Sequence, residues 1–294
     1  GKFADVLNDA VAKIANPHQN LMNMNACLGK PGGDSRTITK TPMLYRMALL
    51  SDEDIKAWET SNSASYDTAK KGSSALIAAL KRNLRAELAY WLGDCSLSIF
   101  NDFDKFFDSI DIPTLLVEAV HTSFPPTILS FVLQQHLAPR VIQANGYSSE
   151  AIQEFKSIIA GCKSSVALTR TYLKRAFTAI AKKQPAAHPE LFVDDSCMQA
   201  TDKSFNGALD VVIPAVTMFK DKMDALKLKL SPKAGIAASH LKLANIAVTE
   251  LSTYKMIFKI TKVARDLRIS HHAAKTQPTK TMNANSNKRK QHTK

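Results

Sequence analysis

The sequence predicts an α+β protein with a mainly antiparallel sheet. Segments with apolar residues at helical spacing alternate with β-hairpins, rather than with single strands linked by crossover helices. The chain has 294 residues with 45% apolar content, enough to bury one large core or two modest ones. No internal repeat is visible.

The N-terminal region is predicted to be a helix followed by a hairpin. Apolar residues recur at helical spacing over residues 3–14, and Pro17 ends that pattern. In residues 28–46, a Gly/Pro turn separates short runs rich in Thr and Ile. This arrangement predicts a β-hairpin that leads into a helix at Met43.

Residues 72–93 are predicted to form an amphipathic helix. Ser73 or Ser74 can serve as its N-cap, and Gly93 can serve as its C-cap. Large apolar side chains gather on one face of this helix, namely Leu76, Ile77, Leu80, Leu84, Leu88 and Trp91.

The middle of the chain predicts one strand, two helices and a hairpin. Residues 96–101 are a short β-prone run. Prolines open the two helical segments, 112–122 and 126–137, at positions where helices tolerate them. Residues 140–144 and 151–156 are then predicted to pair as a hairpin.

The last part of the sheet is expected to carry acids at a hairpin tip. Gly161 precedes a helical pattern that extends to residue 181. An apolar run then ends at Asp194 and Asp195 and is followed by another strand-like run, which predicts a hairpin. Residues 205–228 are again amphipathic, and short strands are expected after them.

Charge and composition limit the partners. The formal charge of +13 favours a polyanionic partner, either nucleic acid or an acidic membrane surface. The stretch 262–294 carries nine Lys or Arg against one acid, so residues 261–294 are expected to be a basic, disordered tail or a binding arm.

Location is predicted from what the sequence lacks. It has no apolar run long enough for a membrane helix and no signal-peptide pattern at its start. The four cysteines are far apart without zinc-ligand spacing, which favours a reducing compartment. We therefore expect an intracellular protein, nuclear or cytoplasmic; the NKRK cluster at 287–290 is either an import signal or tail charge.

Acidic residues follow two of the predicted strands. Asp102 comes after one strand, and Asp194 with Asp195 comes after another. If these carboxylates converge, they form a hard oxygen-ligand site suited to Mg²⁺. Such a site can clamp two ions about 3.5 to 4 Å apart for phosphoryl transfer. An aromatic-x-Asp-Asp string alone is common by chance. The order and spacing of several motifs are therefore needed to support a metal site here.

Three motifs stand in the order found in one enzyme family. They are LGKPGGDSRTITKTPMLYRM at 28–47, DFDKFFDSID at 102–111 and FVDD at 192–195, with Asp194 lying 92 residues after Asp102 (194 minus 102). From residue 30 to about residue 269, the sequence resembles the reverse transcriptases of non-LTR retroelements and group II introns.

The resemblance implies a fold and a domain order. It implies a right-hand polymerase with fingers and palm, whose palm has an antiparallel ferredoxin-like sheet backed by helices. The corresponding ranges are a leader at 1–27, fingers at 28–95 and a palm with finger insertions at 96–260. No recognisable endonuclease or RNase H region accompanies them, and the chain could be a fragment of a longer element protein.

The resemblance also assigns the metal site. Asp102 and Asp194 would be primary ligands and Asp195 a weaker one, together forming the catalytic site for two Mg²⁺ ions, with Mn²⁺ as a substitute. Asp104 and Asp108 are interpreted either as structural residues or as residues that support the metal ligands without touching the ions.

Several residues would then contact the incoming dNTP. Lys30 and Arg36 match the fingers motif that binds the triphosphate, although Thr37 replaces the usual proline. Phe107 matches the aromatic gate that excludes a 2′-hydroxyl by steric clash. Phe106, beside it, replaces the usual alanine.

A glycine-led turn corresponds to the family's Gly-x-Pro-Gln-Gly-Ser motif. Gly161 matches it, whereas Ser164 and Ser165 stand where Gln and Gly are expected, so Gly161 and Ser164 are dNTP-contact candidates. Lys233, in KLKLSPKAGI, is an additional candidate near the leaving pyrophosphate. Arg268, in VARDLRI, replaces a glycine of the hairpin that grips the primer.

The leading hypothesis is an RNA-directed DNA polymerase of a retroelement that uses an RNA template, a DNA primer and dNTPs. A decayed or domesticated palm that binds nucleic acid without catalysis is an alternative, favoured by the altered turn and by Arg268. An RNA-dependent RNA polymerase is a third, and Phe107 argues against it.

Overall fold

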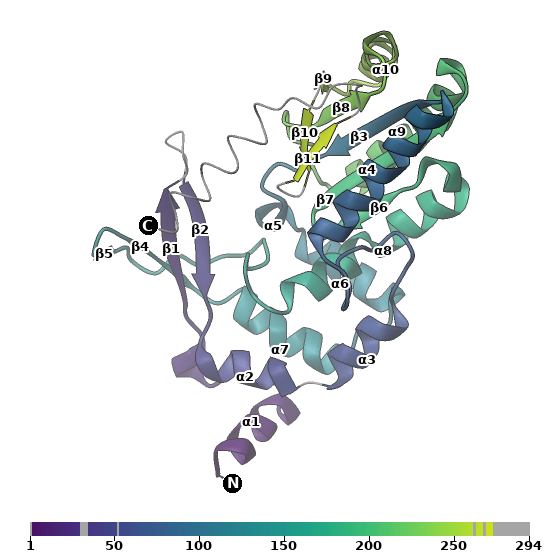
Figure 1. Cartoon of the computed structure of the whole chain (residues 1–294). Coiled ribbons are helices and arrows are strands. Elements are labelled where there is room, and N and C mark those ends of the chain that lie inside the picture. The colour runs from purple at the N-terminus through teal and green to yellow at the C-terminus, as the bar shows by residue number, and fades with distance from the viewer. Residues whose placement is uncertain (1, 30–34, 52, 261–262, 267–268, 273–294) are drawn as a thin grey trace, which may run out of the picture. The chain divides into compact units, whose positions relative to one another are not determined.

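The computed structural model describes residues 2–29, 35–51, 53–260, 263–266 and 269–272 (Figure 1). The chain divides into two compact units, each assembled from three segments. The first unit comprises residues 1–64, 104–176 and 223–229, and the second comprises 65–103, 177–222 and 230–294. The assignment of fingers and palm to particular ranges stays a prediction.

The first unit combines helices with a four-stranded sheet. The strand order is β2-β1-β4-β5, in which β1 is antiparallel to β2 and parallel to β4. Its elements are α1 (Lys2–Ala12), η1 (His18–Asn20), β1 (Asn23–Gly29), β2 (Ser35–Lys40), α2 (Met43–Ser51), α3 (Glu53–Ser61), α5 (Phe106–Ser109), α6 (Ile112–His121), α7 (Pro126–His136), β4 (Arg140–Ala144), β5 (Tyr147–Ser148) and the first part of α8 (Ser165–Lys183). The predicted N-terminal helix and the β1–β2 hairpin are confirmed.

The predicted strand at 151–156 is wrong. The partner of β4 is instead β5, joined to it by the two-residue turn Asn145–Gly146. Both turn residues have positive φ, 50° and 83°, which is the hairpin turn that Asn-Gly favours. Ile152 forms only an isolated bridge to Arg140.

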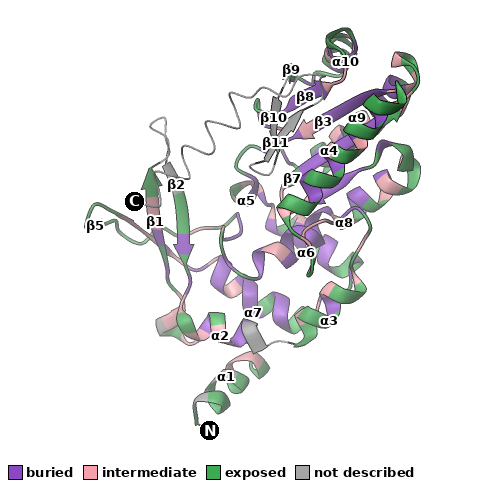
Figure 2. Ribbon diagram, viewed as in Figure 1, coloured by how far each residue is buried: buried purple, intermediate pink, exposed green. Residues whose placement is uncertain are grey.

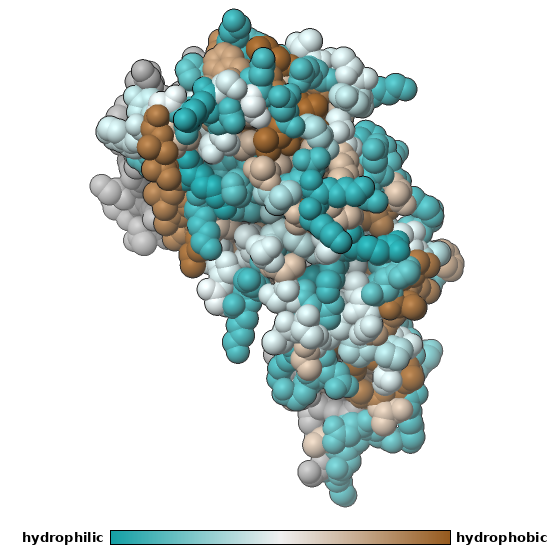
Figure 3. Space-filling model, turned by 90° about the vertical axis from the view of Figure 1, so that its right-hand side faces the viewer, coloured by the Kyte–Doolittle hydropathy of each residue, from teal (hydrophilic) through white to brown (hydrophobic). Residues whose placement is uncertain are grey.

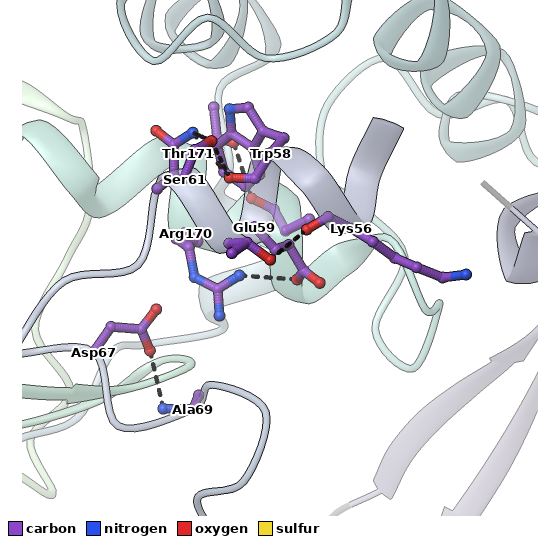
Figure 4. A network of polar contacts seen from close by, with 11 residues as sticks. Lys56, Trp58, Glu59, Ser61, Asp67, Ala69, Arg170 and Thr171 are labelled. Atoms are coloured by element: carbon purple, nitrogen blue, oxygen red, sulfur yellow. Dashed lines mark hydrogen bonds and ion pairs between the residues drawn. The ribbon is translucent and has the colours of Figure 1, made fainter. Parts of the chain in front are cut away.

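The polar helix α3, which sequence periodicity missed, docks in the first unit through a few specific contacts (Figure 4). Trp58 is its buried residue, and its indole N–H donates to the carbonyl of Thr122 at 2.9 Å. Arg170 pairs with Glu59 at 2.8 Å. An aromatic anchor and an ion pair therefore help to hold a helix that has little apolar surface.

The second unit is a five-stranded sheet with helices, so the predicted α+β class is confirmed. The strand order is β6-β7-β3-β8-β9, antiparallel except for the parallel pair β8–β9. Its elements are α4 (Ala75–Leu92), β3 (Cys95–Asn101), the end of α8, η2 (Pro185–Ala187), β6 (Glu190–Phe192), β7 (Asp195–Asp202), all but the last three residues of α9 (Phe205–Ala225), β8 (Gly235–Ala238), α10 (Leu241–Thr253), β9 (Lys259–Ile260), β10 (Val263–Asp266) and β11 (Ile269–His272).

The centre of this sheet is buried on both faces. Leu97 and Ile99 of β3 are fully buried on one face, and Ser96 and Ser98, which alternate with them, are at most 2% exposed on the other. The Phe219 ring of α9 lies 5.8 Å from Phe177 and 5.9 Å from Phe103. Of the helices that the structure describes, none is both long and apolar enough to cross a membrane.

Part of the predicted C-terminal tail is ordered as strands. β10 and β11 pair antiparallel in a separate two-stranded sheet. Residues 261–262, 267–268 and 273–294 lie outside the described residues, and Arg268 is among them.

The helix predicted at 72–93 is confirmed, but its orientation is the reverse of what its amphipathic pattern suggests. Ser74 caps α4 by accepting from the N–H of Ile77, and Gly93 ends it with φ 76°. The buried face consists of small side chains and one arginine, namely Ala78, Ala79, Arg82, Ala86 and Ala89. The large apolar side chains point outward, and the α4 ribbon in Figure 2 is accordingly exposed along its outer side.

Candidate functional site

The Asp-Asp pair lies where β6 turns into β7 in the second unit. Phe192 pairs with Asp195, so Val193 and Asp194 form the turn between the two strands. Val193 has φ 60°, an unusual conformation for a β-branched residue, and it marks a tight connection. Asp194 is half-buried and Asp195 is exposed at the start of β7.

Strand register brings Asp102 to the same end of the sheet. Asn101 of β3 pairs with Ser196 of β7, so the next positions along the two strands are Asp102 and Asp195. Opposite residues in an antiparallel pair have Cα atoms about 4.5 to 5.5 Å apart. The half-buried Asp102 therefore lies beside the acidic turn, although 92 residues separate it from Asp194 (194 minus 102).

Lys233 belongs to the same neighbourhood. The carbonyl of Asp102 accepts a hydrogen bond from the N–H of Ser231 at 2.7 Å. The Ser231 hydroxyl in turn accepts from the N–H of Lys233 at 3.2 Å, and the Lys233 side chain is exposed. One cation thus lies two residues from a direct contact with the Asp102 backbone.

The fit of this end of the sheet to a metal ion is partial. Carboxylate oxygens are the ligands that Mg²⁺ prefers, and the strand register brings two of the aspartates next to each other. Within the described ranges, however, no three acidic, His or Cys side chains lie close enough together to hold an ion. The donor chemistry therefore fits Mg²⁺, while binding would require the carboxylates to reorient.

A buried ion-pair network holds the acidic hairpin against α4. Glu190 of β6 accepts from Arg82 at 2.6 Å and from Arg85 at 2.5 Å. Arg85 also donates to the side-chain oxygen of Gln199 at 3.0 Å, and the Gln199 amide donates to the carbonyl of Arg82 at 3.0 Å. The Glu190 and Arg82 side chains are 8% and 3% exposed, so this pair is shielded from water.

Sequence reasoning missed this network, although a signal was present. Arg82 lies on the alanine side of the helix, opposite the leucines. Small side chains let a helix approach a sheet closely, so an arginine among them needs a buried acid as partner. Glu190, which opens the strand before the Asp-Asp turn, is that acid.

The nucleotide-contact candidates belong to the first unit, apart from Lys233. Lys30 lies outside the described residues. The backbone of Arg36 pairs with Leu28 in the β1–β2 hairpin. Phe107 in α5 is half-buried, and its carbonyl accepts from the N–H of Ile158 at 2.9 Å.

The Gly161 turn adopts a conformation that requires glycine. Gly161 has φ 90°, in the left-handed region. A Cβ added there would meet only Ile38, at 3.9 Å, so the backbone angle and not space restricts the position. This agrees with the expected glycine-led turn before α8.

Ser164 is buried in a polar network. Its hydroxyl lies 3.1 Å from His136 Nε2, 3.2 Å from the Tyr45 hydroxyl and 3.1 Å from Cys162 Sγ. Because the N–H of Ile159 donates to His136 Nδ1, the ring proton is on Nε2 and points at Ser164. Burial lowers the pKa of His136 from 6.5 to about 3, so the ring is neutral.

This network has two consequences for the site. His136 in this tautomer is a donor to Ser164 and does not act as its general base. The Ser164 side chain, which is 2% exposed, is engaged inside the unit, so a contact to a nucleotide from this turn would come from its backbone.

The candidates therefore form two groups. Asp102, Asp194, Asp195 and Lys233 come together in the second unit, while Arg36, Phe107, Gly161 and Ser164 lie in the first. No protein-family model and no curated protein matches this sequence.

Proposed function

We propose that this chain is an RNA-directed DNA polymerase with a fingers–palm fold, which extends a DNA primer on an RNA template. The observation that carries the proposal is the register that sets Asp102 beside Asp195, next to the Asp194 turn. Nucleotidyl transfer needs carboxylates that hold two metal ions close together. Here two motifs that are far apart in the sequence place their carboxylates at the same end of an antiparallel sheet.

The reaction joins the primer to a dNTP. The primer 3′-hydroxyl oxygen forms a bond to the α-phosphorus, the bond to the bridging oxygen breaks, pyrophosphate leaves, and the hydroxyl proton passes to solvent. Asp102, Asp194 and Asp195 would hold the divalent cations. When bound, Mg²⁺ or Mn²⁺ would activate the hydroxyl and neutralise charge on the leaving group.

The remaining residues would bind and select the nucleotide. Lys30 and Arg36 would neutralise the triphosphate, and Lys233 would do so for the departing pyrophosphate. Phe107 would reject ribonucleotides by a clash with the 2′-hydroxyl. The backbone of the Gly161 turn would support the base, since the Ser164 hydroxyl is already engaged.

Primer extension tests the proposal. The wild type and Asp194→Asn are compared at equal purity on an RNA template with dNTPs and Mg²⁺ or Mn²⁺. Extension by the wild type should fall by at least about 100-fold in the variant, because a ligand carboxylate is lost. Asp104→Asn is the matched control, since Asp104 is exposed two residues from Asp102 and is not assigned as a metal ligand.

Substrate choice gives a second readout. Phe107→Ala should increase incorporation of ribonucleotides relative to deoxynucleotides, because the clash is removed. If the wild type extends nothing under any of these conditions, the polymerase proposal is refuted.

A nucleic-acid-binding module without catalysis is the second candidate. The buried Ser164 network favours it, because a turn fixed by three side-chain contacts replaces the family's Gln-Gly pair. The charge of +13 would supply the affinity. Salt-sensitive RNA binding by both the wild type and Asp194→Asn, with no extension by either, would favour this candidate.

A further inference from the structure

The outer side of α4 exposes a row of large apolar side chains, and α4 also contacts β11. Seven residues with exposed fractions between 41% and 77% form this surface, here called the α4 leucine face: Leu76, Ile77, Leu80, Leu84, Leu88, Trp91 and Leu92. Figure 3 shows it as a continuous hydrophobic stripe along the left edge of the view.

The area of this surface is at the upper end of the range for the largest apolar patch of a monomer. Seven large side chains, each about half exposed, present on the order of 600 Å² of apolar area, which is comparable to the ~800 Å² that each partner contributes to a standard protein interface. The opposite side of the helix is already used, because Arg82 and the alanines pack on the sheet. The leucines therefore do not contribute to the core of their own unit.

The pattern of the face suits a second copy of itself. Its five leucines are spaced four residues apart, so they form one i±4n ridge along the helix. The commonest class of helix packing interdigitates such ridges from both helices. In a two-fold dimer both subunits use the same surface, so each leucine ridge meets an identical ridge on the partner.

Charges beside the face select the direction of packing. On a helix with about 100° per residue, Lys81 lies ~60° to one side of Leu84 and Glu87 lies ~60° to the other. Both side chains are exposed. A two-fold axis that keeps the helices parallel brings Lys81 of one copy to the Glu87 side of the other. An antiparallel pair would instead bring Lys81 to Lys81.

We propose that the α4 leucine face is a homodimer interface in which two α4 helices pack in parallel around a two-fold axis. The interface lies on the opposite side of α4 from the Glu190 network, and its formation does not require polymerase activity.

Sedimentation velocity over the micromolar range tests the proposal. The wild type should sediment as a dimer, and Leu84→Glu should be monomeric, because it puts two carboxylates at the centre of the apolar contact. Val120→Glu is the matched control: Val120 on α6 is also a highly exposed apolar side chain, at 79%, and its replacement should leave the dimer intact. Far-UV circular dichroism should show the same helix content in all three proteins.

A charge swap tests the direction. Lys81→Glu should raise the dimer Kd about tenfold at low salt, because two attractive pairs become repulsive. Adding Glu87→Lys should restore the wild-type Kd. A monomeric wild type, or a Leu84→Glu variant that remains dimeric, overturns the dimer interface; a dimer in which the double swap restores nothing overturns the parallel arrangement.

Discussion

Replacing Glu190 with Gln should destabilise the second unit by about 3 to 4 kcal/mol. The substitution keeps the shape of the side chain and removes the carboxylate that bridges Arg82 and Arg85. Removing one partner of a buried ion pair costs about 3 to 5 kcal/mol, because the remaining charge is left in a site without water. Arg85, whose side chain is 31% exposed, is screened by solvent and adds less than about 1 kcal/mol.

Urea unfolding followed by circular dichroism measures this loss, and hydrogen exchange of peptides from α4 and β7 localises it. Glu250→Gln is the control, since the same charge is removed from an exposed position on α10 of the same unit, outside the α4 leucine face. A second variant, Glu190→Leu with Arg82→Leu, should recover most of the stability, because the fully buried charges are both removed and Arg85, which is left without Glu190, is 31% exposed to solvent. A loss below about 1 kcal/mol for Glu190→Gln would refute the reasoning.

Three further changes probe other parts of the fold. Gly161→Ala should cost about 1 to 2 kcal/mol in urea unfolding, because φ 90° suits only glycine there. His136, with its pKa lowered to about 3, contributes stability above pH 6.5 that is lost as the pH falls toward 3; the loss should reach about 2 kcal/mol at pH 5, and His136→Gln should flatten that dependence. Gly207→Ala should lower the melting temperature by several degrees, because its Cβ would lie 2.1 Å from Asp202 Oδ1, which accepts two hydrogen bonds from Ser204.

Local chemistry explains which elements the sequence could predict. Ser74 and Gly93 bound α4 because capping depends on neighbouring residues alone. The acidic hairpin followed from an apolar run that ends in two aspartates. The partner of β4 was predicted wrongly, as residues 151–156 instead of β5, because the turn after β4 was assigned too many residues. The dipeptide Asn145–Gly146 is the strongest short hairpin signal and indicates a two-residue turn.

Non-local packing explains what the sequence could not predict. Periodicity identified the two faces of α4, but it could not tell that the face with Arg82 would pack on the sheet. That choice depends on Glu190, which is 108 residues away, and no local pattern joins the two. Likewise, His136 gave no sign of its role beside Ser164, because only the tertiary fold brings α7 to the Gly161 turn.

The interleaved segments of the two units have a consequence for biosynthesis. The chain passes between the units at residues 64/65, 103/104, 176/177, 222/223 and 229/230. A nascent chain leaving the ribosome therefore cannot finish the first unit until residue 229 has been synthesised, by which point much of the second is already present. Neither unit corresponds to one continuous stretch of coding sequence, so expressing either one alone would require its segments to be rejoined by new linkers.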